Sequence, residues 1–197
     1  MTGVILCGGE SSRMGQNKAF IEIQGKRIID RTVNLFGELF DEVLLVTNSP
    51  LDYLDLNVRI VTDLIPKKGS LGGIYTGLFF STSPQAFFVG CDMPFLETKV
   101  IRLFLDLSEE ADIVVFRAEQ RWEPLHAVYS RKCIKPIERL MTQGDLKIIK
   151  AYKGMKVREI TKSELEQFDP ELYSLMNINT PEDLKKIVSA FHRNPAT

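Results

Sequence analysis

The sequence predicts one α/β domain built on a mostly parallel sheet with helices on both faces. Three observations lead to this fold class. Short apolar runs that suit buried strands alternate with segments whose apolar residues recur at helical spacing. The chain has 197 residues, the size of one domain, and no linker-like stretch or internal repeat divides it. We therefore expect one domain over residues 1–192 and a frayed tail over 193–197.

Each predicted strand is a short run rich in β-branched and other apolar residues. In chain order these runs cover residues 4–7, 42–46, 58–62, 86–90, 112–116, 125–130, 157–160 and 173–177. The first helix is predicted over 28–40, where Ile29, Val33, Phe36 and Phe40 share one face. Further helical patterns cover 72–81, 97–107, 131–143 and 145–151.

The last predicted helix has the clearest start signal. Thr180 is a candidate N-cap, Pro181 suits the first helical position, and Glu182 and Asp183 place negative charge in the first turn. An apolar stripe from Leu184 onward then predicts a helix that packs on the sheet.

Composition excludes several classes of protein. The 25 Lys and Arg residues balance 26 Asp and Glu, so the chain lacks the basic excess of proteins that bind nucleic acids or membrane surfaces. Its three cysteines, Cys7, Cys91 and Cys133, form no C-x-x-C pair, which argues against a zinc site or a disulfide framework. With no long apolar run or signal peptide, we expect a reduced, cytoplasmic location. His126 and His192 are too far apart in sequence to suggest a His-based metal cage.

A glycine-rich loop follows the first strand, with the sequence Val-Ile-Leu-Cys-Gly-Gly-Glu-Ser-Ser-Arg-Met-Gly-Gln-Asn-Lys over 4–18. It matches neither the P-loop nor the G-x-G-x-x-G fingerprint. Gly8 and Gly9 allow a backbone to approach an anion closely, and Ser11 and Ser12 add hydroxyl donors. Arg13 offers a planar fork for phosphate oxygens and Lys18 a mobile charge. The alternative is a plain turn with a solvated Arg and Lys.

Polar residues also follow the next three predicted strands. Asn48 follows the second strand, and Asp63 follows the third, with a second glycine cluster from Gly69 to Gly73 after it. Asp92 follows the fourth strand and could hold Mg²⁺, which takes one or two carboxylates together with substrate phosphates. Taken singly, Asn48, Asp63 and Asp92 could each be a turn residue. In parallel sheets ligands bind beyond the carboxyl ends of the strands, so the whole set indicates a mononucleotide triphosphate site.

At these motifs the sequence resembles the molybdenum cofactor guanylyltransferases. The segment from Leu6 to Lys18 is similar to the family signature L-A-G-G-x-S-x-R-M-G-x-D-K. Residues 69–74 resemble the family segment G-P-L-A-G, and 91–96 match C-D-M-P-F-L. The segments Glu123-Pro-Leu-His-Ala-Val-Tyr129 and Asn177-Ile-Asn-Thr-Pro-Glu-Asp-Leu184 resemble later family segments, so the likeness covers nearly the whole chain.

The resemblance implies a single Rossmann-like nucleotidyltransferase domain with a mixed sheet, and an enzyme that uses Mg²⁺. The implied reaction joins GMP from GTP to the molybdopterin cofactor, forms the guanine dinucleotide and releases pyrophosphate. Molybdoenzymes or their chaperones are implied as further partners. The GTP-binding residues that it implies are Leu6, Cys7, Gly8, Gly9, Lys18, Asn48, Asp63, Gly69, Gly73 and Asp92. Asn177 and Asn179 would face the pterin, Asp92 would bind the metal, and Arg13, Lys18 and Asp92 would be catalytic.

Three positions depart from the family pattern. Cys7 stands where the family has alanine, and we expect no catalytic role for it. Asn17 replaces an aspartate before the lysine, which removes a negative charge near the phosphates. Ser70 replaces the proline of G-P-L-A-G, which loosens the loop expected to hold guanine.

Charge sets the expected mechanism. The attacking phosphate is already an anion, so catalysis consists of positioning and electrostatic stabilisation. Lys18 would meet charge at the α-phosphoryl group, and Arg13 would hold the departing pyrophosphate. The alternatives are a cytidylyl or sugar-phosphate nucleotidyltransferase of the same fold, and a non-catalytic GTP-binding partner in molybdoenzyme maturation. A Rossmann oxidoreductase is disfavoured because Asn48, not an acidic residue, ends the second strand.

Overall fold

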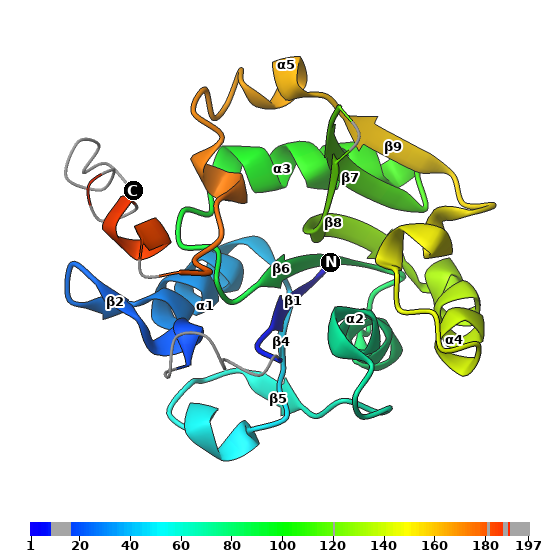
Figure 1. Ribbon diagram of the computed structural model, residues 1–197, viewed down its shortest axis with the longest axis horizontal. Coiled ribbons are helices and arrows are strands. Elements are labelled where there is room, and N and C mark those ends of the chain that lie inside the picture. The colour runs from blue at the N-terminus through cyan, green and yellow to red at the C-terminus, as the bar shows by residue number, and fades with distance from the viewer. Residues whose placement is uncertain (9–16, 120, 181, 187–188, 190–197) are drawn as a thin grey trace.

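The computed structural model describes residues 1–8, 17–119, 121–180, 182–186 and 189. Within these residues seven strands form the central sheet, in the order β5-β4-β1-β6-β8-β7-β9 (Figure 1). The strands are β1 (Thr2–Leu6), β4 (Glu42–Val46), β5 (Arg59–Val61), β6 (Gln85–Gly90), β7 (Ile113–Ala118), β8 (Arg121–Ser130) and β9 (Val157–Ile160). A separate hairpin joins β2 (Glu22–Ile23) to β3 (Lys26–Arg27).

The sheet is mixed and mostly parallel, as predicted. β1 pairs in parallel with β4 and β6, β4 with β5, and β7 with β9, whereas β8 runs antiparallel between β6 and β7. The neighbours β5, β4, β1 and β6 are the strands whose ends carry the predicted polar residues. Their carboxyl ends therefore lie side by side at one edge of the sheet.

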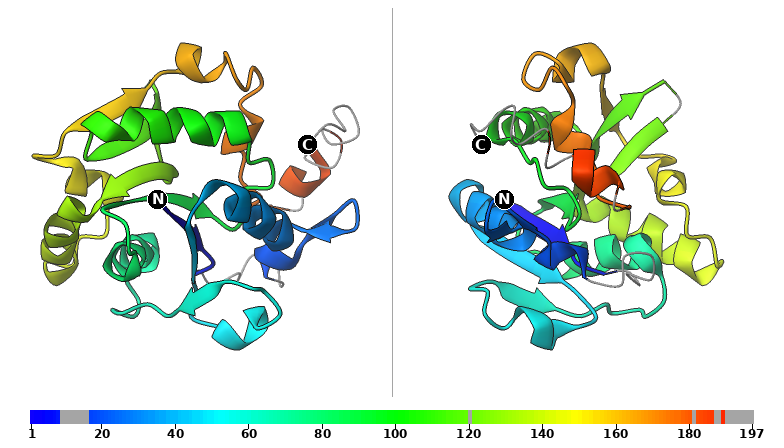
Figure 2. Two further views of the ribbon diagram at one scale, coloured as in Figure 1. Left: turned by 180° about the vertical axis from the view of Figure 1, so that it is seen from behind. Right: turned by 60° about the vertical axis from the view of Figure 1, so that its left-hand side comes forward.

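Helices cover both faces of the sheet (Figures 1 and 2). The α-helices are α1 (Ile28–Leu39), α2 (Gly69–Phe80), α3 (Thr98–Asp106), α4 (Ile134–Thr142) and α5 (Lys162–Leu165). Alternation along each strand separates two cores, because successive side chains point to opposite faces. Val4 and Leu44 pack with α2 and α4 on one face, while Ile5 and Leu45 pack with α1 and α3 on the other.

A glycine allows α2 to lie directly on the sheet. A Cβ at Gly77 would lie 2.6 Å from Phe88 Cε1 and 2.8 Å from Val4 Cγ1, both in the buried core. We expect Gly77→Ala to lower the free energy of unfolding by about 1–3 kcal/mol, because overpacking outweighs the gain in helix propensity. The matched control is Gly37→Ala in α1, where a Cβ meets nothing within 4 Å. Urea unfolding of both variants measures this, and equal stabilities would contradict it.

The prediction of a strand over residues 173–177 is wrong. Tyr173–Leu175 form a 3-10 helix, η6. The Asp169 carboxylate accepts hydrogen bonds from the backbone N–H groups of Tyr173 (3.0 Å) and Ser174 (2.7 Å), and Leu172 has a left-handed φ of 54°. These local bonds turn the backbone, although the apolar alternation imitates a strand.

Several observed element boundaries differ from the predicted ones, and two short elements were not predicted. α2 begins at Gly69, three residues before its predicted start, and β8 begins at Arg121, four residues early. The helical segment over 145–151 is a 3-10 helix, η5 (Ile148–Tyr152). The β2–β3 hairpin and α5 were missed. The hairpin turn places Gln24 and Gly25 at positive φ, a pattern usually signalled by Asn-Gly.

The hairpin holds the C-terminal segment against the sheet. Ile21, Ile23 and Ile28 form a small apolar cluster with Phe95 and Ile178. The predicted cap at Thr180 is confirmed, because its hydroxyl accepts from Asp183 N (3.1 Å) and the Asp183 carboxylate accepts from Thr180 N (2.9 Å). Residues 182–186 are helical, whereas Pro181 and the predicted tail lie outside the described residues. None of the described helices has the length and apolar character needed to span a membrane.

Candidate functional site

Three of the proposed site residues meet at the carboxyl edge of the sheet. Lys18 Nζ lies 3.3 Å from Asp92 Oδ2 and 2.7 Å from Asn179 Oδ1. The Lys18 and Asp92 side chains are 21% and 23% exposed, so both are shielded yet reachable by a ligand. Segments far apart in the sequence therefore build one charged centre.

Lys18 begins a short 3-10 helix, η1 (Lys18–Phe20). Asn17 caps this helix, since its side-chain Oδ1 accepts from Ala19 N at 3.1 Å. Ala19 is fully buried, which anchors the turn in the core. Gly9 and Arg13, predicted to contact phosphates, lie outside the described residues.

Asp92 is placed by the end of β6. It follows Gly90, which pairs with Leu6 of β1, and a Cβ at Gly90 would lie 2.7 Å from Asp92 Oδ1. The absence of a side chain at Gly90 therefore makes room for the carboxylate. The Asp92 carbonyl accepts a hydrogen bond of 2.9 Å from Ile178 N, which ties the C-terminal segment to this strand end.

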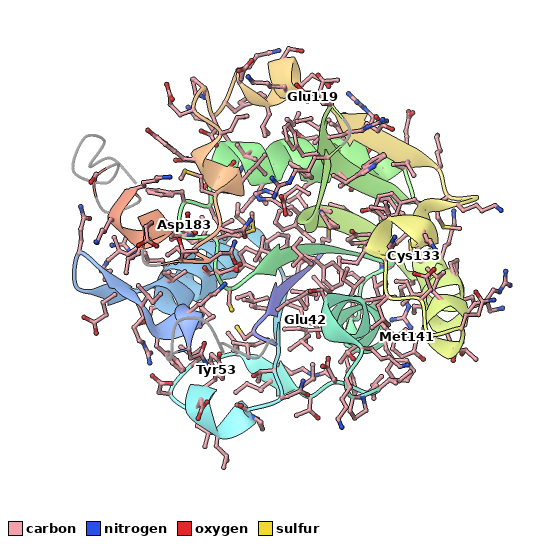
Figure 3. The ribbon with its side chains drawn as sticks, viewed as in Figure 1. Glu42, Tyr53, Glu119, Cys133, Met141 and Asp183 are labelled. Carbon is pink, nitrogen blue, oxygen red and sulfur yellow. The ribbon has the colours of Figure 1, made fainter. Side chains whose placement is uncertain are left out.

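The two asparagines of the C-terminal segment have different surroundings. Ile178 between them is fully buried, and Asn179 is fixed by its backbone N–H, which donates to Asp183 Oδ2 at 3.0 Å. Its side chain can then reach Lys18. The Asn177 amide instead donates to the Leu175 carbonyl at 3.4 Å, so the structure does not join it to Lys18 or Asp92. Figure 3 shows Asp183 and Tyr53 on the side of the molecule that carries the hairpin.

A second polar pair lies at the ends of β4 and β5. Asn48 Nδ2 donates to Asp63 Oδ2 at 2.8 Å. The other carboxylate oxygen, Asp63 Oδ1, is buried and has no hydrogen-bond partner within the part of the chain that the structure describes. A buried acceptor of this kind is costly unless a donor reaches it.

The second glycine cluster forms the start of α2. Gly69 has a φ of +55°, a conformation that favours glycine. A Cβ at Gly73 would lie 3.2 Å from Leu6 Cδ2, so this glycine brings the first turns of α2 against the end of β1. Leu6 is itself nearly buried, at 7% exposure. Of the residues predicted to bind GTP, Leu6 and Gly73 thus lie together where α2 meets the end of β1, and Gly69 begins that helix.

Neither the cysteine of the loop nor the buried histidine suits acid–base or nucleophilic chemistry. Burial raises the pKa of Cys7 well above its ordinary value, and the neighbouring Cys91 raises it further, so the thiol is protonated near neutral pH. Burial also lowers the pKa of His126 to about 4. This ring is fully buried, and its centroid lies 5.2 Å from the ring centroid of Phe87 and 4.9 Å from that of Phe104, as expected for a core residue.

Glu123 was not predicted as a site residue, although it begins one of the segments that resemble the family. The register between β7 and β8 jumps from Val115–Ala127 to Phe116–Glu123, so a bulge interrupts β8. Burial raises the pKa of the Glu123 carboxyl; Arg121 opposes this, and the charge of Asp92 adds to it. Bulges re-aim side chains beside active sites, and Pro124 within the strand was the signal that could have revealed this one.

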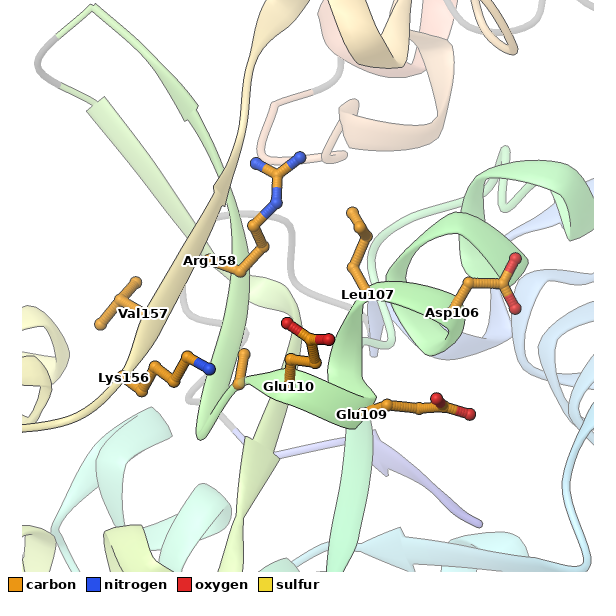
Figure 4. A pocket seen from close by; sticks show the side chains of 8 residues that line it. Asp106, Leu107, Glu109, Glu110, Lys156, Val157 and Arg158 are labelled. Carbon is orange, nitrogen blue, oxygen red and sulfur yellow. The ribbon is translucent and has the colours of Figure 1, made fainter.

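A surface cavity of about 360 Å³ lies elsewhere (Figure 4). It is lined by Asp106, Leu107, Glu109, Glu110, Ala111, Lys156, Val157 and Arg158. Lys156 precedes β9, which runs parallel to β7, so this cavity lies toward the amino end of that strand pair. It is therefore separate from the centre built around Lys18 and Asp92.

Comparison with known proteins agrees with the geometry. The family model described as "MobA-like NTP transferase domain" matches residues 3–157. A protein of Desulfosudis oleivorans named molybdenum cofactor guanylyltransferase is 42% identical over 192 residues, covering 96% of this chain and 95% of that protein. A probable molybdenum cofactor guanylyltransferase of Natranaerobius thermophilus is 35% identical, with 94% of each chain covered.

A solved structure has the same fold over nearly the whole length of this chain. It is the molybdopterin-guanine dinucleotide biosynthesis protein A of Archaeoglobus fulgidus, with a TM-score of 0.85 and 26% sequence identity. The match covers 98% of this chain and 100% of that one.

Proposed function

Because the chain belongs to the molybdenum cofactor guanylyltransferase family and carries a MobA-like NTP transferase domain, we propose that it transfers GMP from GTP to the molybdopterin cofactor. A terminal phosphate oxygen of the cofactor attacks the α-phosphorus of GTP. The bond from the α-phosphorus to the bridging oxygen of the β-phosphate breaks, and pyrophosphate leaves. The observation that carries this proposal is the contact of Lys18 with both Asp92 and Asn179.

The ends of β4 and β5 suit the nucleoside. Asp63 Oδ1 supplies an acceptor that has no partner among the described residues, and Asn48 holds the other oxygen of that carboxylate in place. Guanine and ribose both offer donors to such an oxygen. Ser70 follows Gly69 at the start of α2, where the backbone approaches the end of β1.

The centre suits the transferring phosphoryl group. The Lys18 ammonium carries a further N–H donor beyond its contacts with Asp92 and Asn179, and this donor is available to an α-phosphate oxygen. Asp92 and Asn179 thus hold the positive charge where negative charge develops. Asn177, Asn179 and Glu123 are the candidates for contact with the second substrate, the pterin.

The residues of this centre fit a divalent cation that is shared with substrate phosphates. Asp92 offers a hard carboxylate oxygen, with Glu123 as a nearby second carboxylate. Among the described residues, no group of three or more His, Cys, Asp or Glu gathers to form an all-protein cage. We propose that Asp92 holds Mg²⁺, which when bound supplies positive charge to the phosphate oxygens. Lys18, already paired with Asp92, keeps that carboxylate oriented toward the phosphates.

Nucleotide selectivity tests the proposed substrate. With Mg²⁺ present, GTP should raise the melting temperature more than CTP, ATP or NAD does, because a ligand that binds only the folded state stabilises it. Differential scanning fluorimetry at equal nucleotide concentrations measures this. A preference for CTP would favour the cytidylyl alternative and would leave the fold assignment unaffected.

Two further parts of the proposal concern its setting. Transfer of radiolabelled GMP to purified molybdopterin distinguishes an enzyme from a non-catalytic GTP-binding partner, which would bind GTP without forming the dinucleotide. Molybdoenzymes or their chaperones are the proposed recipients of the product. The proposed location is cytoplasmic, and cell fractionation tests it.

A further inference from the structure

A partly buried hydrogen bond lies next to the lysine of the proposed site. Asn17 Nδ2 donates to the Tyr53 hydroxyl at 2.8 Å, and Asn17 directly precedes Lys18. Tyr53 ends the 3-10 helix η2 (Pro50–Tyr53), which follows the end of β4. The contact therefore links the nucleoside side of the site to the turn that carries Lys18.

The direction of this hydrogen bond is fixed by the cap of η1. Ala19 N can only donate, so the Asn17 atom 3.1 Å from it must be the carbonyl oxygen Oδ1. The amide nitrogen then faces Tyr53, and the tyrosine oxygen must accept. One side chain thus makes both contacts and fixes the entry to η1.

Tyr53 is a rigid support for that contact. It is fully buried, and its ring packs 5.0 Å from the ring of Phe20, at the other end of η1. Asn17 and Phe20 therefore contact the same tyrosine from both ends of the turn. The backbone position of Lys18 is set between them.

The tyrosine hydroxyl still has a proton that needs an acceptor. Cys7 packs in the same apolar cluster as Tyr53. The two groups lie close enough that the Tyr53 hydroxyl lowers the pKa of the Cys7 thiol, against the larger effect of burial. The sulfur is a weak acceptor that an alanine at this position would lack.

We propose that Asn17 and Tyr53 are positioning residues for Lys18, with the Cys7 sulfur as the acceptor for the Tyr53 hydroxyl. The two departures from the family pattern at positions 7 and 17 are then one coupled feature. An aspartate at 17 would accept from both Ala19 N and the Tyr53 hydroxyl, so no acceptor would be needed at 7. An asparagine at 17 reverses the second bond and calls for the sulfur. The catalytic consequence rests on the proposed function, whereas the hydrogen bonds do not.

The experiment combines four variants with single-turnover GMP transfer at saturating GTP. Tyr53→Phe keeps the ring and removes the hydroxyl, and should lower the rate constant about tenfold with little change in the KM for GTP, because Lys18 acts on the chemical step. Cys7→Ala should lower it about threefold in the native background. In the Asn17→Asp background Cys7→Ala should cost clearly less, because the carboxylate accepts the tyrosine proton. Asn17→Asp alone is the reference for this second comparison and the conservative variant at position 17.

Comparing the effect of Cys7→Ala in the native and Asn17→Asp backgrounds distinguishes a hydrogen-bonding role of the sulfur from a packing role. Loss of sulfur volume would cost the same in both backgrounds, so equal effects of Cys7→Ala would overturn its role as acceptor. An unchanged rate constant in Tyr53→Phe, or a change in KM alone, would overturn the positioning role. Urea unfolding of each variant identifies any that fails to fold, and Asn17→Ala then serves in place of Tyr53→Phe.

A second readout does not depend on GMP transfer. In protein labelled with ¹⁵N-asparagine, hydrogen exchange of the Asn17 side-chain amide should be slow, and should become fast in Tyr53→Phe. Equal exchange in both proteins would overturn the hydrogen bond even if transfer occurs. Slow exchange in a protein that transfers no GMP would contradict the proposed function and support the hydrogen bond.

Discussion

Asp92→Asn should lower the rate of GMP transfer by orders of magnitude while leaving the protein folded. The substitution keeps the shape of the side chain and its place against Gly90 but removes the charge that would hold the cation and pair with Lys18. Folding should change by less than about 1 kcal/mol, because partly exposed ion pairs contribute little to stability. Turnover at increasing Mg²⁺ concentration, together with urea unfolding, measures both effects.

The matched control is Asp106→Asn, an exposed carboxylate on α3 beside the separate cavity. It carries the same chemical change away from the proposed site and should retain turnover. If Asp92→Asn reaches turnover close to that of the native chain at saturating Mg²⁺, Asp92 is only a turn residue.

The sequence predicted that the candidate site residues would gather at one edge of the sheet, because the carboxyl ends of neighbouring parallel strands lie at the same edge. Leu6, Val46, Val61 and Gly90 end the four strands that became neighbours in the sheet. Ligands bind beyond such ends, so Asn48, Asp63 and Asp92 could be placed at one edge without coordinates. The strand period and the helix period also predicted which layers form, because both follow from side-chain direction alone.

The contacts within the site could not be predicted in the same way. Lys18 meets Asn179 only because Ile178 is buried in the hairpin cluster and because Asp183 fixes the backbone of Asn179. The burial of Ile178 is tertiary, and the hairpin itself had no Asn-Gly signal, whereas the bond from Asn179 to Asp183 is local to the predicted helix start. The segment that leads into Ile178 was mistaken for a strand because its apolar alternation outweighed the local effect of Asp169.

Glu123 and Tyr53 were missed for a different reason. Each looks like an ordinary strand or turn residue, and each gains meaning from what lies opposite it. The bulge in β8 turns Glu123 into the neighbourhood of Asp92, and the cap at Asn17 directs its amide at Tyr53. The periodicity of apolar residues carries no information about such contacts between residues that are far apart in the sequence.

Lys18→Ala should lower the rate of the chemical step at saturating GTP roughly a hundredfold. This corresponds to a rise of about 3 kcal/mol in the activation free energy, the scale seen when one preorganised donor is removed. The structure supports preorganisation, because Asp92 and Asn179 hold the ammonium before any substrate arrives. If Lys18 merely attracted GTP, its loss would raise KM and leave kcat unchanged. Single-turnover rates for the native chain and the variant separate these two roles.

Two further variants sharpen this test. Lys18→Arg should recover only part of the rate, because a planar guanidinium cannot replace a compact ammonium between Asp92 and Asn179. Lys26→Ala removes an exposed lysine on β3 and should leave the rate unchanged, which controls for the loss of general positive charge. An unaltered single-turnover rate in Lys18→Ala would contradict a role in the transition state. An equal rate loss in Lys18→Ala and Lys26→Ala would also contradict it, because the effect would then not be specific to the contacts of Lys18 with Asp92 and Asn179.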